Sequence, residues 1–257
     1  MFKYFLSFLW ASKNEHSLHS PFVFELYTKV ITNHSNLPIF KEIENLRKQL
    51  LKDTKVIEIT DFGAGSKIYK TSQRQIKQIA KSAEKNPKFG RLLFRLIQWF
   101  KPTVIFDLGT SLGITTIYES KAYEQAKIFS FEGCPATAAI AKENFEALGC
   151  ENIELIVGNL DETLLKTVKE VNHIDFAFFD ANHRFDPTMR YFEICLAKAT
   201  EDSVFVFDDI HWSEEMHLAW QEIKRHPEVM ISIDLFFVGL IFFRKNQPKQ
   251  HFILRYY

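Results

Sequence analysis

From residue 103 to residue 244 the chain alternates short apolar runs with longer stretches of helical periodicity. The apolar runs predict strands at 104–108, 126–132, 153–157, 174–180 and 203–208. The periodic stretches predict helices at 115–123, 135–148, 160–171, 188–197 and 213–225. Short apolar strands that alternate with helices are typical of a parallel sheet covered by helices on both faces.

Two more apolar runs, 230–235 and 238–244, follow with only two residues between them. A parallel crossover needs a much longer connection, so we expect these runs to form an antiparallel hairpin. The predicted fold class is therefore α/β, with five parallel strands and a C-terminal antiparallel hairpin.

The first hundred residues have a different, mostly helical texture, with clear periodicity in 22–31 and 39–51. One β-like piece, 56–60, runs into a Gly- and Ser-containing turn at 61–66. We therefore divide the chain into a helical extension or cap (1–98), an α/β domain (99–245) and a tail (246–257).

The opening stretch, Met1 to Ala11, is apolar but too short to span a membrane. We expect an amphipathic helix that docks on the body of the protein, with weak contact to a membrane surface as the alternative. Lys and Arg together number 32, as do Asp and Glu, so the chain has no overall field that attracts nucleic acid. Three widely spaced cysteines without zinc-ligand spacing indicate free thiols and a cytoplasmic location.

Glycine is scarce, nine in all, which makes the loop after the first α/β strand informative. Gly109 would let the chain turn close to a ligand, and Gly113 would let the following helix pack on the strand. The loop lacks the G-x-G-x-x-G pattern of dinucleotide sites and has an acid, Asp107, at the strand end. Asp107 suits a cationic amino-acid group, and Glu132, at the end of the next strand, suits the two hydroxyls of a ribose.

Asp107 to Gly113, followed by Glu132, resembles the first two motifs of class I S-adenosylmethionine-dependent methyltransferases. The similarity is nearest to the caffeoyl-CoA and catechol O-methyltransferase group, with its GTSLG loop, and covers about residues 90–244. The resemblance implies a Rossmann-like methyltransferase fold and S-adenosylmethionine as the cofactor. The residues it assigns to the cofactor are Asp107, Gly109, Ser111 and Gly113 for the methionine loop, Glu132 for the ribose, and Gly158, Asn159 and Leu160 for the adenine. Asn159 stands where many relatives have Asp.

Acidic residues also end the fourth and fifth predicted strands, at Asp180, Asp208 and Asp209. Carboxylates brought together repel one another unless a cation binds or a proton is shared, and Mg²⁺ or another divalent cation prefers such oxygen ligands. In the metal-dependent O-methyltransferases that the chain resembles, the third ligand is Asn, so Asp209 adds a negative charge. The alternative is that these carboxylates cap helices without a metal.

His183 replaces the lysine that the resemblance would place three residues after Asp180. An imidazole can accept a proton near neutral pH, so His183 is the candidate catalytic base, with Asp180 beside it and His211 in reserve. The alternative is that His183 only orients Asp180.

The predicted function is S-adenosylmethionine-dependent O-methylation of a small hydroxylated acceptor, with or without a divalent metal. Two alternatives stay open: a non-catalytic cofactor-binding or scaffold domain of the same fold, and an NAD- or nucleotide-sugar-binding Rossmann enzyme. Relatives in the group that the chain resembles often form homodimers, and the sequence leaves the oligomeric state of this chain open. The segments 16–22 and 61–66 are either covers of the substrate pocket or an ordinary helix start and turn.

Overall fold

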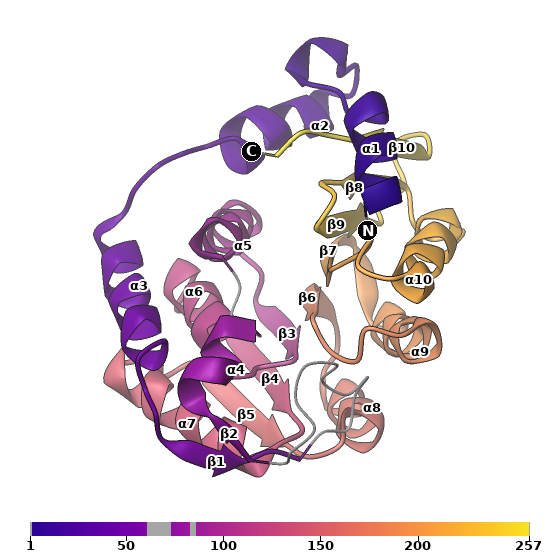
Figure 1. Ribbon diagram of the computed structural model, residues 1–257. Helices are drawn as coiled ribbons and strands as arrows, with labels where there is room; N and C mark the ends of the chain where they lie inside the picture. The colour runs from indigo at the N-terminus through magenta and orange to yellow at the C-terminus, as the bar shows by residue number, and fades with distance from the viewer. Residues whose placement is uncertain (1, 61–72, 83–85, 257) are drawn as a thin grey trace. The chain divides into compact units, whose positions relative to one another are not determined.

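The computed structural model describes residues 2–60, 73–82 and 86–256, and these form two compact units. One unit consists of Met1–Asn33 with Leu164–Tyr257, and the other of His34–Thr163 (Figure 1). Their limits differ from the boundaries near residues 98 and 245 that the sequence pattern indicates. The turn predicted at 61–66 lies outside the described residues.

The unit His34–Thr163 contains three parallel strands that lie side by side in Figure 1. They are β3 (Val104–Leu108), β4 (Lys127–Glu132) and β5 (Ile153–Val157). All three were predicted within one residue, because each is an apolar run bounded by polar or turn residues. The helices of this unit are α3 (Pro38–Leu50), α4 (Ile76–Ser82), α5 (Pro87–Phe100), α6 (Ile114–Ala122) and α7 (Pro135–Ala147).

The β-like piece at 56–60 forms the short strand β1 (Val56–Glu58), which pairs antiparallel with β2 (Gln73–Gln75). Helix α5 packs closely on α6 at Gly90, which faces the ring of Tyr118. Only glycine fits there, because a Cβ at this position would lie 2.4 Å from that ring. Helix α3 adds Phe40, whose ring meets that of Phe94 edge-on at 4.9 Å between centroids. These contacts hold α3, α5 and α6 together within the unit His34–Thr163.

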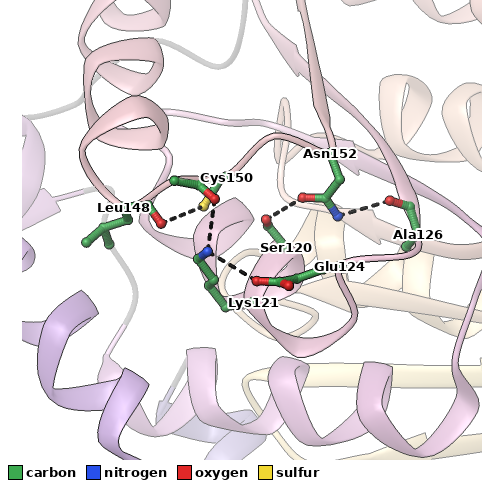
Figure 2. Close-up of polar contacts among 8 residues, drawn as sticks. Ser120, Lys121, Glu124, Ala126, Leu148, Cys150 and Asn152 are labelled. Atoms are coloured by element: carbon green, nitrogen blue, oxygen red, sulfur yellow. Dashed lines mark hydrogen bonds and ion pairs between the residues drawn. The ribbon is translucent and has the colours of Figure 1, made fainter.

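Polar side chains hold the amino ends of β4 and β5 in this unit (Figure 2). Asn152, just before β5, donates its amide to Ala126 O (3.0 Å), just before β4, and accepts a bond from Ser120 Oγ of α6 (2.5 Å). Lys121 of the same helix donates to Gly149 O (3.0 Å) and pairs with Glu124 (3.3 Å). The amino-terminal edge of these strands is thus fixed by structural contacts, and the carboxyl-terminal edge carries the predicted site residues.

The other unit contains a mixed parallel and antiparallel arrangement of strands. Strand β6 (Ile174–Phe179) runs parallel to β7 (Ala199–Asp208), and β7 pairs antiparallel with β9 (Val238–Phe242). Strand β8 (Ile231–Asp234) pairs antiparallel with β9, which confirms the predicted hairpin. Three predicted helices are also present: α8 (Leu160–Glu170), α9 (Phe185–Leu196) and α10 (Glu214–Arg225). Helix α8 begins in the other unit.

The segment 246–257, predicted as a tail, contains a further strand. Strand β10 (Gln250–Ile253) pairs in parallel with β8, and Lys13 forms a bridge to Leu254 at its end. The prediction of a tail is wrong for these residues. Four residues carry too little periodicity to indicate a strand, and these four become one by pairing with β8.

The opening apolar stretch forms helix α1 (Phe2–Ala11), which docks on its own unit as predicted. The rings of Phe5 and Phe8 contact Phe236 at 4.9 and 5.3 Å between centroids, and the ring of Tyr4 stacks on His217 at 4.1 Å. The stretch 22–31 becomes α2 (Pro21–Leu26), continued by a π-helical turn over Tyr27–Ile31. Within the described part of the chain, no helix has the length and apolarity to cross a membrane.

Candidate functional site

The loop after β3 is tightly wound and lies at the carboxyl end of its strand. Gly109, Ser111 and Gly113 all have left-handed backbone conformations, with φ of 118°, 50° and 83°. The amides of Gly109 and Thr110 donate to the carbonyl of Phe131 in β4, at 3.1 and 3.0 Å. The loop is therefore bound to the neighbouring strand, and two of its positive φ values fall on glycines, which adopt them at little steric cost.

Asp107 lies at the base of this loop and is completely buried. Its Oδ2 accepts hydrogen bonds from Thr116 Oγ1 of α6 (2.5 Å) and from Ser130 Oγ of β4 (2.7 Å). Sequence reasoning identified Asp107 but missed these two hydroxyl partners, since a single Thr or Ser in an apolar run has no distinguishing signal. The two bonds fix the carboxylate between the helix and the strands.

Glu132, at the end of β4, holds the loop that follows β3. Its Oε2 accepts a hydrogen bond from the Ser111 amide (2.8 Å), and its Oε1 accepts one from the Cys134 amide (2.9 Å). Burial raises the pKa of this carboxyl, and these backbone donors oppose that effect. Each carboxylate oxygen has two lone pairs, so each retains acceptor capacity for a further donor such as a hydroxyl.

The third predicted cofactor segment follows β5. Gly158, with φ of 141°, donates its amide to Glu132 O at 2.9 Å, which joins this segment to the second one. Asn159 Oδ1 accepts from the Asp161 amide (3.0 Å), so this side chain caps the helix that begins at Leu160. Its amide group is a donor that this cap does not use. The structure thus brings the three predicted segments together along successive strand ends of one unit.

Glu119 is a second buried carboxyl in the same unit, and no sequence pattern distinguishes it from other helical glutamates. It lies in α6, has no exposed surface, and its pKa is raised well above the ordinary value by burial and by the charge of Asp107. Neither of its carboxyl oxygens has a hydrogen-bond partner among the residues that the structure describes. Both causes disfavour the ionised form of Glu119.

The other unit carries a compact group of three possible metal ligands: Asp180, His183 and Asp208. One ligand atom from each lies within 4.8 Å of the others, and His183 Nε2 is 3.4 Å from Asp180 Oδ1. Asn182 has a left-handed conformation, with φ of 48°, which turns the chain directly after Asp180 and just before His183. Asp208 is buried at the end of β7.

Two residues that the sequence predicted for this region, Asp209 and His211, lie outside the three-residue group. Asp209 is not part of the three-residue group; its φ of 53° turns the chain immediately after β7, and its carbonyl accepts a bond from the Trp212 amide (2.9 Å). His211, the reserve base, has both ring nitrogens in hydrogen bonds, Nε2 to Asp234 Oδ2 (2.7 Å) and Nδ1 to His217 Nδ1 (2.9 Å). The structure therefore substitutes His183 for Asp209 as the third member.

The donor set of this group suits a divalent cation. Two carboxylates and one imidazole are common ligands for Mn²⁺, Fe²⁺ and Zn²⁺. Mg²⁺ prefers oxygen ligands, so it would use mainly the two carboxylates. The same three groups without a cation would place two carboxylates close together, with His183 as a partner for one of them.

Comparison with known proteins shows similarity to methyltransferases. Residues 106–210 match the family model described as a methyltransferase domain. The chain is 27% identical over 128 residues to a catechol O-methyltransferase of Niastella koreensis, which covers 49% of this chain and 57% of that protein. The chain thus spans little more than half the length of this curated relative.

Solved structures establish the fold. An S-adenosylhomocysteine-bound methyltransferase of Podospora anserina aligns with a TM-score of 0.61 and 14% identity over 88% of this chain and 97% of that one. An O-methyltransferase of Bacillus cereus in complex with S-adenosylhomocysteine aligns with a TM-score of 0.58 and 16% identity over 85% and 99%. The predicted Rossmann-like methyltransferase fold is confirmed.

Proposed function

We propose that this chain, which belongs to the S-adenosylmethionine-dependent methyltransferases of the catechol and caffeoyl-CoA O-methyltransferase type, methylates a hydroxyl group of a small molecule. The observation that supports this most is the loop Gly109–Gly113, which follows the buried Asp107 and whose Ser111 amide donates to Oε2 of Glu132.

The residues of this loop fit the methyl donor. Asp107 supplies a fixed negative charge near a loop whose glycines allow close approach of a ligand, which suits the amino-acid part of the cofactor. Glu132 would accept the ribose hydroxyls with its remaining lone pairs, and Asn159 would offer its amide group to the adenine. When bound there, S-adenosylmethionine supplies a methyl group on a positively charged sulfur.

Asp180, His183 and Asp208 would orient the acceptor hydroxyl and manage its proton. A divalent cation held by these three residues would lower the pKa of the hydroxyl that it binds. Without a cation, His183 would take the proton itself, with Asp180, 3.4 Å away, to stabilise the imidazolium. The two possibilities differ in whether Mg²⁺ or Mn²⁺ is needed for turnover.

The test is a calorimetric titration of EDTA-treated protein with S-adenosylhomocysteine, followed by methyl transfer to a panel of hydroxylated acceptors with and without Mg²⁺ or Mn²⁺. We expect micromolar binding, and a Kd roughly 10–100-fold weaker for Glu132→Gln, because its amide group would face a backbone N–H. NADH serves as the negative control ligand. Binding of NADH instead of S-adenosylhomocysteine would contradict the proposal, and cofactor binding without any transfer would favour the scaffold alternative.

Homodimer formation, a cytoplasmic location and the lack of nucleic-acid binding stay predictions. The acceptor is a small hydroxylated molecule in this proposal, and the panel of acceptors is the means to identify its class.

A further inference from the structure

A buried chain of hydrogen bonds lies beyond the end of β7, outside the three-residue group. Asp234 and His211 are 7% and 6% exposed, and Asp234 Oδ2 is 2.7 Å from His211 Nε2. His211 Nδ1 is 2.9 Å from Nδ1 of His217, whose own ring is stacked on Tyr4 of α1. Neither the proposed cofactor site nor the group of Asp180, His183 and Asp208 uses these residues.

Asp234 determines which atoms donate and which accept along this chain of hydrogen bonds. Its Oδ1 already accepts a hydrogen bond from the Phe236 amide (2.8 Å), and its Oδ2 accepts one from Nε2–H of His211. In a neutral His211 the other nitrogen, Nδ1, is then an acceptor, and His217 donates its Nδ1–H to it. Both nitrogens of His211 are thus occupied by hydrogen bonds to other side chains.

His211 connects the turn after β7 to the end of β8. Asp208 is the last residue of β7 and lies opposite Val238 of β9. The chain turns sharply at Asp209, and three residues after Asp208 the side chain of His211 reaches the end of β8 at Asp234. The turn that carries Asp208 is therefore tied to the terminal hairpin by one buried, charge-assisted hydrogen bond.

We propose that His211 is a positioning residue: anchored by Asp234, it fixes the turn after β7 so that Asp208 is oriented toward Asp180 and His183. This inference rests on the proposed function of those three residues as a cation site. This role differs from that of the reserve base predicted from the sequence, because His211 here acts through Asp208.

The experiment measures Mn²⁺ binding by calorimetry in EDTA-treated wild type, His211→Leu and His211→Gln, together with S-adenosylhomocysteine binding in each. Leucine removes the N–H donor at similar size, whereas the amide of glutamine restores a donor in the place of Nε2. Loss of a group that orients a metal ligand commonly costs 10–100-fold in metal affinity. We expect the Mn²⁺ Kd to rise roughly 10–100-fold in His211→Leu and to recover to within about threefold of wild type in His211→Gln.

The S-adenosylhomocysteine Kd should be unchanged in both variants, because the residues proposed to hold this ligand belong to the other unit. His251→Leu is the matched control: it removes an imidazole hydrogen bond to Ser232 of β8 (2.8 Å) in the same unit and should leave Mn²⁺ binding intact. If His211→Leu does not fold, Asp234→Asn replaces it, since an amide weakens the same bond with little change of shape.

Wild-type Mn²⁺ affinity in His211→Leu would overturn the inference, and so would an equal loss in His251→Leu. Wild type that binds S-adenosylhomocysteine but no Mn²⁺ would overturn both the cation site and this role of His211, while leaving the methyltransferase proposal in place. Wild type that binds neither ligand would overturn the proposed function itself.

Discussion

Replacement of Glu119 by glutamine tests whether this buried carboxyl of α6 stays protonated in the folded protein. The side chain is fully buried in α6, and burial together with the charge of Asp107 raises its pKa well above the ordinary value. In the unfolded chain the same carboxyl would ionise near pH 4.5. Above that pH the unfolded state releases a proton that the folded state keeps.

This difference in proton binding makes the wild type less stable as the pH rises. The free energy of unfolding falls by up to about 1.4 kcal/mol per pH unit between the unfolded and folded pKa values of Glu119. From pH 5 to pH 7 the limit is about 2.7 kcal/mol, which corresponds to roughly 5–10 °C in Tm for a chain of this size. Glutamine has nearly the same shape and no proton to lose, so the Glu119→Gln variant lacks this contribution.

The assay is thermal and urea denaturation of wild type and Glu119→Gln at several pH values between 5 and 8. We expect the stability of the variant to exceed that of the wild type by a margin that grows with pH. Glu143→Gln, at an exposed position on α7, is the control for loss of one carboxyl group. Parallel pH profiles for wild type and Glu119→Gln would refute the reasoning, because they would mean that Glu119 is ionised in the folded protein.

Three further substitutions test the packing. Gly113→Ala should lower the free energy of unfolding by about 2–5 kcal/mol, from the left-handed φ and a Cβ placed 2.5 Å from Phe145, as measured by urea denaturation. Gly239→Ala should lower it by about 1–3 kcal/mol, since its Cβ would lie 2.6 Å from the ring of Trp220; an unchanged urea midpoint would contradict the packing of this strand. Tyr4→Ala should speed amide hydrogen exchange in α1 by roughly 2–12-fold through loss of a stacked ring, with exchange in β7 unaffected.

The strands and most helices of the α/β part could be predicted from the sequence, because the length and periodicity of apolar runs are local properties. Asp107 and Glu132 could be identified for the same reason: each stands at the end of its strand, and parallel strands place their ends along one edge. Strand β10 could not, since its four residues form a strand only through pairing with β8.

The partners of the site residues depended on contacts between distant segments. Ser130 reaches Asp107 across 23 positions of the sequence, and Asp234 reaches His211 across another 23. No local pattern encodes such a pairing, because it depends on how neighbouring strands align.

The sequence by itself determined that this chain is an α/β protein with acidic residues at the ends of its strands and a loop suited to S-adenosylmethionine. The tertiary structure decided which acids act together. A left-handed residue, Asn182, precedes His183, and His183 lies with Asp180 and Asp208. A second left-handed residue, Asp209, follows β7 and stays outside this group. Asn and Asp adopt positive φ more readily than most residues, but which side chains such turns bring together depends on how distant strands pair.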